Sequence, residues 1–384
     1  MAAAAAAALG NRLLGGVVVG VPTAGDPEST PLERLTGGHP VPNAGSEAAG
    51  RRALAMAAVA RPDERVLVLL SGGASALLAA PAAGLTLADK QRATTVLLNE
   101  GAEIHRLNAV RKHLSAIKGG QLAVATAAPS LTLMISDVVG DDPSVIASGP
   151  TVADPSTFRE ALDALDHLGG RAAYPAAVVA HLERGMAGEN PETPKPGDPR
   201  LARASALVVG GRRQAMEGAA ATARRLGYHA VVLEQPVVGE ARQAAVVQVG
   251  YMAEVAAAAD RRRPICVISS GETTVRVTGL GRGGRNQEFA LAAATLREHL
   301  WTSVPGRWTM LASVGTDGVD GPTDAAGAVV DSTTLARALR AGLAPPGEFL
   351  HNNDAYAFFA PLGDLIKTGP TGTNVGDLQV FLSV

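Results

Sequence analysis

Short apolar runs alternate with amphipathic segments along most of the 384-residue chain. Each run is four to eight residues long, which is the length of a buried strand, and the stretches between them have the three-to-four spacing of helices. This alternation is typical of βαβ units and predicts an α/β protein with a mainly parallel sheet. The predicted strands are Gly16–Val21, Arg65–Leu70, Leu131–Ser136, Ala204–Val209, His229–Leu233, Pro264–Ser269, Thr273–Thr278, Thr309–Ser313 and Leu378–Leu382.

Two helices and a proline-rich segment organise the second half of the chain. Arg212–Leu226 has helical spacing and is followed by Gly227, a residue expected just beyond a helix end, and Asn286–Leu300 is a second amphipathic helix. The prolines of residues 189–199 remove amide donors and fix φ, so this segment continues neither a helix nor a central strand. We therefore predict two α/β domains, residues 1–200 and 201–384, with a boundary near residue 200.

Composition narrows the class of protein. The 36 acidic and 34 basic residues give a net charge of −2, which creates no field to attract nucleic acid or anionic lipid, so we expect neither as a partner. The single cysteine, Cys266, excludes a disulfide framework and a cysteine-based metal cluster, and its apolar surroundings predict a buried core residue. Met1–Leu9 has no basic start and is too short to span a bilayer, so we expect a cytoplasmic protein.

Two polar blocks in the first half are candidate anion sites. The loop Ser71–Ser75 follows a predicted strand, where small residues let backbone amides approach an anion, although a glycine turn without a ligand has the same pattern. Residues 108–120 would form a helix with a cationic face, ending in glycines that permit close approach; a solvated helix face is the alternative. The candidates are Ser71, Gly72, Gly73, Ser75, Asn108, Arg111, Lys112, Ser115, Lys118 and Gly119.

Two acidic blocks follow apolar runs at positions where α/β sheets bind ligands. Asp137 ends one strand, and its hard oxygens suit Mg²⁺, whereas Asp141 and Asp142 are also explained by turns that carry no metal. The loop Gly315–Gly327 holds three carboxylates between glycines, which favours a metal-binding or hydroxyl-binding loop over a plain surface loop. Its candidates are Asp317, Gly318, Asp320 and Asp324, and Ser148 and Gly149 follow the first block.

The block with the sharpest pattern joins Glu272 to a glycine-rich stretch that runs into a helix. Glycines free the backbone, the helix N-terminus supplies partial positive charge, and Arg285 adds a planar fork that matches a carboxylate or a phosphate. Asn286 follows it. The alternative is that Arg285 only pairs with a nearby carboxylate.

Taken together and in this order, these blocks resemble the glycerate 2-kinase family, whose members are often labelled hydroxypyruvate reductases. The resemblance runs through nearly the whole chain and rests on Gly38-His39-Pro40-Val41-Pro42-Asn43, Ser71-Gly72-Gly73, residues 108–120 and 136–142, Ser148-Gly149-Pro150-Thr151, Gly271-Glu272, residues 284–288, Gly318-Val319-Asp320-Gly321 and residues 368–375.

This resemblance implies a Rossmann-like N-terminal domain with a parallel sheet and a smaller C-terminal domain that contains a MOFRL region, about residues 263–380, with the active site in the cleft between them. It implies phosphorylation of D-glycerate by ATP to give 2-phosphoglycerate, with small-molecule partners only and with homodimer formation left open. The family also has a Gly-Lys-Ala motif just before the pair that corresponds to Met1-Ala2, so its lysine is absent here. We expect Met1 to be an internal methionine of a longer protein.

Phosphoryl transfer requires an in-line hydroxyl and positive charge on the transferring group, with Mg²⁺ bridging the phosphates. We assign Arg285, Lys112 and Asp317 to catalysis and Asp137 and Asp320 to the metal. Two rival functions remain. A nicotinamide-dependent hydroxypyruvate reductase would use Gly279–Gly284 as its glycine motif, but the acid at the expected distance, Glu298, falls within a predicted helix. A homologue that binds ligands without turnover would be explained by the absent lysine.

Overall fold

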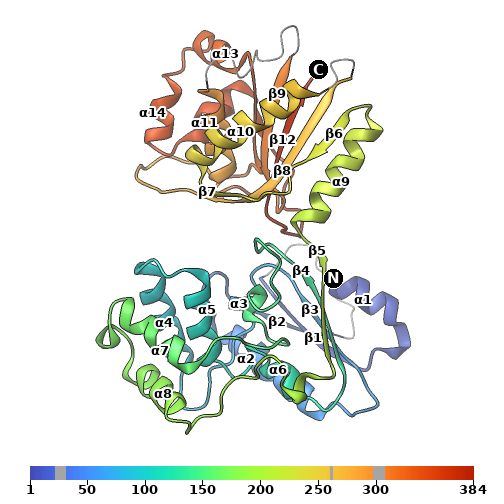
Figure 1. Ribbon diagram of the computed structural model, residues 1–384, viewed down its shortest axis with the longest axis vertical. Helices are drawn as coiled ribbons and strands as arrows, with labels where there is room; N and C mark the ends of the chain where they lie inside the picture. The colour runs from blue at the N-terminus through green and yellow to red at the C-terminus, as the bar shows by residue number, and fades with distance from the viewer. Residues whose placement is uncertain (22–31, 260–262, 297–307) are drawn as a thin grey trace. The chain divides into compact units, whose positions relative to one another are not determined.

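The computed structural model describes residues 1–21, 32–259, 263–296 and 308–384. The chain divides into two compact units (Figure 1). Unit 1 comprises Met1–Ile135 and Asp141–Val209, and unit 2 comprises Ser136–Gly140 and Gly210–Val384. None of the helices in the described ranges is both long and apolar enough to cross a membrane.

The described part of unit 1 contains two small sheets. In the first, β1 (Gly16–Gly20) pairs in parallel with β2 (Leu32–Thr36). In the second, the order is β3-β4-β5, and β3 pairs in parallel with β4, as the apolar runs predicted. The strands of this sheet are β3 (Val66–Leu70), β4 (Ser130–Ile135) and β5 (Ala204–Gly210).

Some of the helices of unit 1 form an apolar cluster of their own. The α-helices of the unit are α1 (Ala2–Leu9), α2 (Ala44–Val59), α3 (Ala74–Leu77), α4 (Leu87–Asn99), α5 (Ile104–His113), α6 (Gln121–Val124), α7 (Phe158–His167) and α8 (Ala176–Met186). The cluster is built from α4, α5, α7 and α8. Leu97, Leu162 and Leu182 are almost fully buried where α4, α7 and α8 meet. Burial of each such side chain stabilises the fold by roughly 1.5–3 kcal/mol. Thr157 forms a capping box with Glu160 that satisfies the first amides of α7.

The proline-rich segment and β5 both belong to unit 1. The sequence placed a boundary near residue 200, which would assign β5 to the second domain, yet β5 is the third strand of the β3-β4-β5 sheet. The segment before it is held against unit 1 by side chains: Thr193 donates to Asp154, and Lys195 donates to the carbonyl of Ser156. The proline run is therefore packed surface of unit 1.

Unit 2 is built on a mixed sheet. In its described residues the strand order is β11-β10-β9-β12-β8-β6, and β7 also pairs with β8. The prediction of a mainly parallel sheet is wrong for this unit, because only β6 and β7 run parallel to β8 and the other pairs are antiparallel. Apolar runs mark strands without revealing their direction. The strands are β6 (His229–Val232), β7 (Val237–Glu240), β8 (Ile265–Thr274), β9 (Thr309–Gly315), β10 (Gly327–Asp331), β11 (Leu365–Ile366) and β12 (Asp377–Ser383).

Strand β8 shows how the sheet is covered on both faces (Figure 1). Val267 packs with Phe289 against α10 (Ala241–Ala258) and α11 (Arg285–Ala294), whereas its neighbour Cys266 packs with Met216 against α9 (Arg212–Arg225). This alternation is the period of two expected of a buried strand. Cys266 is buried as predicted, and burial raises the pKa of its thiol to about 11.

Several element boundaries differ from the predictions. The stretches Pro264–Ser269 and Thr273–Thr278 were predicted as two strands, but β8 runs through Gly271 as one strand and ends at Thr274. Helix α9 ends as predicted, with Gly227 at φ +91°. Helix α11 begins one residue earlier than predicted and ends at Ala294, and residues 297–300 of the prediction lie outside the described residues.

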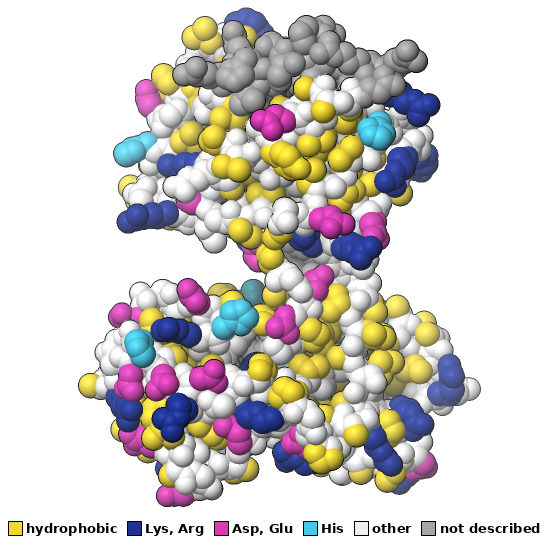
Figure 2. Space-filling model, in the orientation of Figure 1, with side chains coloured by type: hydrophobic (Ala, Val, Ile, Leu, Met, Phe, Trp, Pro, Cys, Tyr) yellow, Lys and Arg dark blue, Asp and Glu magenta, His cyan; other side chains and the backbone are white. Residues whose placement is uncertain are grey.

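The remaining helical segments are short. In unit 2 they are α13 (Thr334–Arg340), α14 (Pro346–His351) and α15 (Ala355–Phe359). Single 3₁₀ turns occur at η1 (Gly10–Arg12), η2 (Ile146–Ser148), η3 (Arg171–Ala173), η4 (Pro199–Leu201) and η5 (Ala360–Leu362). Figure 2 shows that acidic and basic side chains are interspersed over the visible face of both units, in keeping with the net charge of −2.

Candidate functional site

The Ser71–Ser75 loop leaves β3 at its carboxyl end, as predicted from the sequence, and leads into α3. Ser71 is exposed, and Gly72, Gly73 and Ser75 are half-buried. Gly73 has φ +79°, and a Cβ atom there would lie 3.0 Å from the ring of His39. Both conditions require glycine at this position whether or not a ligand is present.

Lys118 ties this loop to a second loop of unit 1. Its Nζ donates to the carbonyl oxygens of Ser75 at 2.9 Å and Ala147 at 3.2 Å, and it lies 3.3 Å from Ser75 Oγ. The side chain is almost fully buried, with 3% of the residue exposed. Lys118 therefore links the Ser71–Ser75 loop to the loop that contains Ala147.

Ser148 lies at the centre of a buried hydroxyl and amide cluster. Its Oγ donates to Asn108 Oδ1 at 2.9 Å and lies 3.0 Å from Ser75 Oγ. The amide nitrogen of Asn108 is buried and has no hydrogen-bond partner among the residues that the structure describes. Ala147, Ser148 and Gly149 have φ of +54°, +60° and +59°, a left-handed run that costs of order 1–3 kcal/mol at each non-glycine residue. Such strain is concentrated at functional sites in proteins.

The expected helical face of residues 108–118 is only partly correct. Helix α5 ends at His113, so Asn108, Arg111 and Lys112 lie on it, but Ser115 and Lys118 lie in the turn that follows. Ser115 Oγ donates to the carbonyl of Ala80, which fixes this turn. The alternative of a solvated face is wrong for the candidates of this block except Arg111, because all the others are buried; Arg111 is half-buried, and Gly119 has φ +58°.

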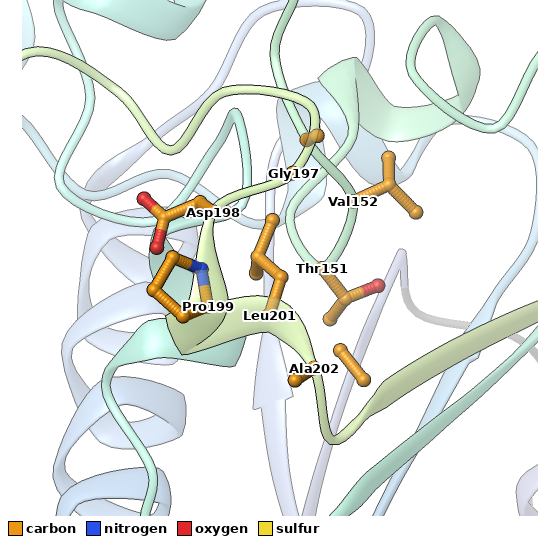
Figure 3. Close-up of a pocket in the computed structure, with 9 residues that line it drawn as sticks. Thr151, Val152, Gly197, Asp198, Pro199, Leu201 and Ala202 are labelled. Atoms are coloured by element: carbon orange, nitrogen blue, oxygen red, sulfur yellow. The ribbon is translucent and has the colours of Figure 1, made fainter.

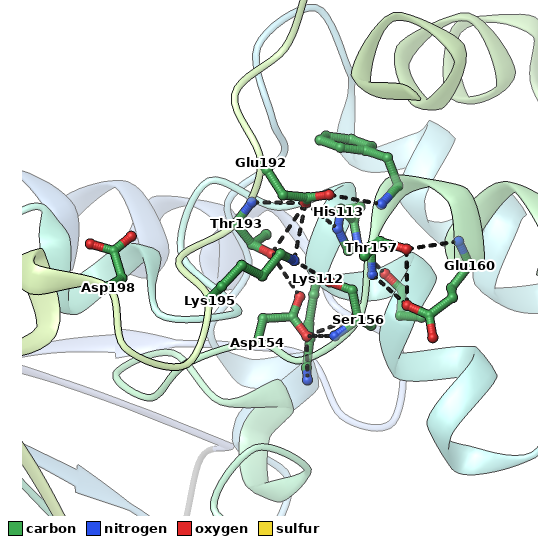
Figure 4. A network of polar contacts seen from close by, with 12 residues as sticks. Lys112, His113, Asp154, Ser156, Thr157, Glu160, Glu192, Thr193, Lys195 and Asp198 are labelled. Carbon is green, nitrogen blue, oxygen red and sulfur yellow. Dashed lines mark hydrogen bonds and ion pairs between the residues drawn. The ribbon is translucent and has the colours of Figure 1, made fainter. Parts of the chain in front are cut away.

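Lys112 is part of a polar network that joins α5 to the proline-rich segment (Figure 4). Its Nζ lies 3.0 Å from Asp154 Oδ1, and both side chains are buried. Burial opposes the charge of Asp154, but Lys112, Ser156 and His113 together lower the pKa of its carboxyl. Thr193 Oγ1 donates to the other oxygen of Asp154 at 3.0 Å. The catalytic role of Lys112 stays a prediction, and this ion pair favours a structural contribution.

Arg285 lies at the start of α11 in unit 2, where two carboxylates hold its guanidinium. Nη1 donates to Glu272 Oε1 at 2.9 Å, Nη2 donates to Asp377 Oδ1 at 3.1 Å, and Nε lies 2.8 Å from Asp377 Oδ2. Burial opposes the charge of Arg285, but these two acids raise its pKa. The side chain remains 29% exposed, so the fork is fixed in orientation and still reaches solvent.

Asn286 and Asp320 anchor the N-terminus of α11. The carboxylate of Asp320 accepts from the backbone amides of Asn286 at 3.0 Å and Gln287 at 2.8 Å. Asn286 Nδ2 donates to Asp377 Oδ1 at 2.9 Å, and Ser313 Oγ donates to Asn286 Oδ1 at 2.7 Å. Burial raises the pKa of both Asp320 and Asp377. Both oxygens of Asp320 already accept backbone hydrogen bonds, although its predicted metal role is not tested by them.

The glycine-rich loop before Arg285 is fixed by a segment that sequence reasoning missed. Asn353 Oδ1 accepts from the amides of Thr278 at 2.8 Å and Gly279 at 3.0 Å, and Asp354 Oδ1 accepts from Arg282 at 2.9 Å. A Cβ atom at Gly281 would lie 2.3 Å from Asp354 Cβ. Close packing against residues 352–354 thus explains glycine in this loop. The run Asn352-Asn353-Asp354 was the available signal, because its residues favour such side-chain-to-backbone bonds.

The acidic loop of unit 2 packs on the loop of residues 368–374. Asp317 Oδ1 accepts from the amide of Val319 at 3.1 Å, which is a local turn contact. Gly318 has φ +83°, and a Cβ atom there would lie 2.0 Å from the carbonyl oxygen of Gly369. Asp137 accepts from Asn374 Nδ2 at 3.3 Å. In the described part of the chain, no group of three or more His, Cys, Asp or Glu side chains could hold a metal ion.

A separate hollow of about 430 Å³ lies in unit 1 (Figure 3). It is lined mainly by apolar side chains and backbone of residues 151–153 and 197–204. Thr151 closes the Ser148–Thr151 block, but none of the predicted site residues lines this hollow.

Comparisons with known proteins agree with the two units. Residues 1–183 match the family described as a domain of unknown function, DUF4147, and residues 265–377 match the MOFRL family. A protein of Pyrococcus horikoshii named glycerate 2-kinase is 37% identical over 356 residues, which is 91% of this chain and 78% of that protein. A Thermotoga maritima protein named D-glycerate 2-kinase is 38% identical over all of this chain and 88% of its own length.

A solved structure supports the same relationship. The crystal structure of glycerate kinase from Thermotoga maritima superposes with a TM-score of 0.87 at 37% identity, covering 100% of this chain and 88% of that one. These matches define the class as two-domain α/β proteins that join a DUF4147 domain to a MOFRL domain. Within that class, the chain belongs to the glycerate 2-kinase family, which confirms the resemblance found in the sequence.

Proposed function

We propose that this protein phosphorylates D-glycerate from ATP, giving 2-phosphoglycerate and ADP. The observation that carries the proposal is the 38% identity to a D-glycerate 2-kinase over the whole chain. The arrangement around Arg285 agrees with it, because a fork fixed by two carboxylates suits a transferring phosphoryl group or a substrate carboxylate.

Each unit supplies a different part of the chemistry. In unit 1, the Ser71–Ser75 loop binds an anion through backbone donors, and the Ser148–Gly149 segment and Lys118 hold that loop in place. In unit 2, Arg285 contacts the reacting group, Glu272 and Asp377 hold its guanidinium, and Asn286 donates to that same Asp377. Asp317 and Gly318 would position the acceptor hydroxyl. Lys112 contributes by fixing the end of α5.

Mg²⁺ fits this chain as an ion that arrives with the nucleotide. Mg²⁺ commonly uses one or two protein carboxylates together with phosphate oxygens and water, so a cage of three acids is not required. Asp137, half-buried and beside Asn374, is the better of the two predicted metal ligands, because Asp320 is engaged by the N-terminus of α11. When bound, the ion would neutralise charge on the transferring phosphate.

The test is an assay of the full-length protein with ATP, Mg²⁺ and D-glycerate. ADP release should depend on both glycerate and Mg²⁺, and enolase alone should consume the product, because enolase uses only the 2-phosphate. A signal that requires added phosphoglycerate mutase would overturn the position of phosphorylation. Absence of glycerate-dependent ADP release would overturn the proposed activity and favour a homologue that only binds ligands.

The reductase alternative is disfavoured by the glycine-rich loop. A dinucleotide-binding motif needs glycines that leave room for a pyrophosphate. In Gly279–Gly284 that space is filled by the backbone of residues 352–354 and by Asp320. The expected acid, Glu298, lies outside the described residues. Oxidation of NADH by hydroxypyruvate without ATP turnover would nevertheless reinstate the reductase.

A cytoplasmic location of the protein stays a prediction.

A further inference from the structure

Three basic side chains in unit 1 gather without an acidic partner. Lys90 on α4 is 7% exposed and donates from Nζ to the carbonyl of Leu114 at 2.9 Å. Lys118 is 3% exposed and contacts only carbonyl and hydroxyl oxygens. Arg111 on α5 is half-buried and reaches the surface. Among the described residues, no ion pair includes any of the three, whereas Lys112 on the same helix is paired with Asp154.

The pKa values of the two lysines are shifted in the direction expected for buried cations that have no ion-pair partner. Burial lowers the pKa of Lys90 to about 7, and Arg111 lowers it further while Glu47 opposes the shift. Burial also lowers the pKa of Lys118 well below its ordinary value, with Lys90 and Arg111 adding to the effect. A buried ammonium without a counter-ion is unfavourable, so the empty protein favours loss of a proton here.

The other charged groups around the cluster do not supply an anion. On α5 and the adjoining segments, His113 is paired with Glu192, and Asp154 is paired with Lys112. On α8, burial lowers the pKa of His181, and Lys90 contributes to that shift. Glu47 on α2 is already paired with Arg51. Lys90 and Lys118 thus contact carbonyl and hydroxyl oxygens, and Glu47 offsets the charge of Lys90 only in part.

A second observation, independent of the charges, also points to a ligand. The buried amide nitrogen of Asn108 has no partner in the described part of the chain, although the amide oxygen of Asn108 accepts from Ser148, which in turn contacts Ser75. Buried donors without a partner are rare in folded proteins. Ala147 and Ser148 of this segment both have a strained, left-handed backbone conformation.

We propose that this part of unit 1 is an anion-binding site in which Arg111 contacts a carboxylate or phosphate oxygen of the ligand, while Lys90 and Lys118 form a buried pair that takes up a proton when the anion binds. The inference rests on the proposed function, since glycerate and ATP are both anions. Lys118 and Lys90 are positioning residues, because their donors are already used by protein oxygens.

The sign of the proton effect follows from the lowered pKa values. Above about pH 7 the empty site holds Lys90 partly neutral, and burial lowers the pKa of Lys118 as well. An anion placed near the pair favours the charged form and raises the pKa of both amines. Binding should therefore take up protons at pH 8, and affinity should fall as the pH rises from 7 to 9.

The experiment is titration calorimetry of the full chain at pH 8, in HEPES and in Tris. D-glycerate and ADP are the probes, so that the two arms separate a carboxylate from a phosphate source. For one of the two probes, the difference in binding enthalpy between the two buffers should show net proton uptake. Arg111→Gln should weaken that probe about tenfold, as loss of a charge-assisted hydrogen bond does. Arg106→Gln, an exposed arginine on the same helix, is the matched control and should bind normally.

Lys90→Met carries the proton test, because replacing Lys118 would also cut the contact between two loops. This variant should bind with less proton uptake and with a flatter pH dependence. Binding of both probes that is unchanged in Arg111→Gln, absence of proton uptake, or binding of neither probe would overturn the inference. If turnover persists while Arg111→Gln binds normally, this inference alone fails. If proton-linked binding occurs without turnover, the proposed activity alone fails.

Discussion

Each unit contains one local cluster of unbalanced charge, and the two clusters have opposite signs. In unit 1, Lys90, Arg111 and Lys118 form no ion pair among the described residues, and the pKa of each of the two lysines is lowered. In unit 2, Glu272 and Asp377 share a single arginine, and burial raises the pKa of each carboxyl, with neighbouring acids adding to the shift of Glu272. Each unit therefore holds its ionisable groups in a state that a ligand of opposite charge would relieve.

The difference indicates two kinds of partner. The basic cluster of unit 1 favours an anionic ligand. The acidic cluster of unit 2 can accept a cation, and the partly exposed guanidinium of Arg285 can bind an anion beside it. A magnesium–nucleotide complex carries both charges. The net charge of −2 does not reveal either cluster, because it is summed over the whole chain.

The largest expected effect is at the arginine of the acidic cluster. Arg285→Ala should lower kcat/KM for glycerate by about 10²–10³-fold, and Arg285→Lys nearly as much, since an ammonium cannot replace a planar fork. Steady-state kinetics measures the loss. Arg285→Ala should also destabilise unit 2, because Asp377 is fully buried and would lose its counter-ion. A fully active Arg285→Lys enzyme would show that Arg285 supplies only diffuse charge.

The paired lysine of unit 1 provides the contrast to its unpaired neighbours. Lys112→Met should lower the free energy of unfolding by about 3–5 kcal/mol, because it leaves the buried Asp154 carboxylate without its cation. Urea denaturation measures this change. The matched control is Arg213→Gln, which breaks an exposed pair with Glu217 and should change stability by less than about 0.5 kcal/mol. Equal effects of the two substitutions would contradict a structural role for Lys112.

Substitutions at two glycines test whether close packing makes the loop before Arg285 rigid. A Cβ atom at Gly284 would lie 2.3 Å from Asp320 Cγ, so Gly284→Ala should lower stability by about 1–3 kcal/mol. At Gly218, within α9, a Cβ atom meets nothing within 4 Å, and Gly218→Ala should raise stability by about 0.5–1 kcal/mol. Thermal unfolding compares them. A neutral Gly284→Ala would mean that the loop yields and that its glycines serve a ligand.

Local patterns in the sequence predicted much of this fold and less of the side-chain geometry. The strand before Ser71 and the helix that ends before Gly227 were correct because each depends on neighbouring residues. The antiparallel pairs of β12 could not be predicted, since pairing depends on contacts distant in sequence. For the same reason, the sequence did not reveal that Asp377 pairs with Arg285. It also concealed that Lys112 is paired while Lys118 is not, although both were assigned to one cationic face.

The smallest expected effect concerns the acid limit of the paired network in unit 1. Burial opposes the charge of Glu192, but hydrogen bonds from His113, Thr193 and Phe158 lower its pKa to about 2. A carboxyl with a depressed folded-state pKa stabilises the fold above its unfolded pKa, and this contribution is lost as the pH falls. The ordinary glutamate pKa of 4.5 sets the upper end, so the window runs from about pH 4.5 to about pH 2.

Glu192→Gln should therefore be less stable than the parent chain at pH 7, by about 1 kcal/mol or less because Glu192 is partly exposed. The difference should shrink as the pH falls through that window. Urea unfolding followed at several values between pH 7 and pH 3 measures it. Glu189→Gln, an exposed acid of the same segment, is the matched control and should follow the parent chain at every pH. A Glu192→Gln deficit that stays constant down to pH 3 would mean that the carboxylate charge contributes nothing and that only the shape of the side chain holds the proline-rich segment to α5.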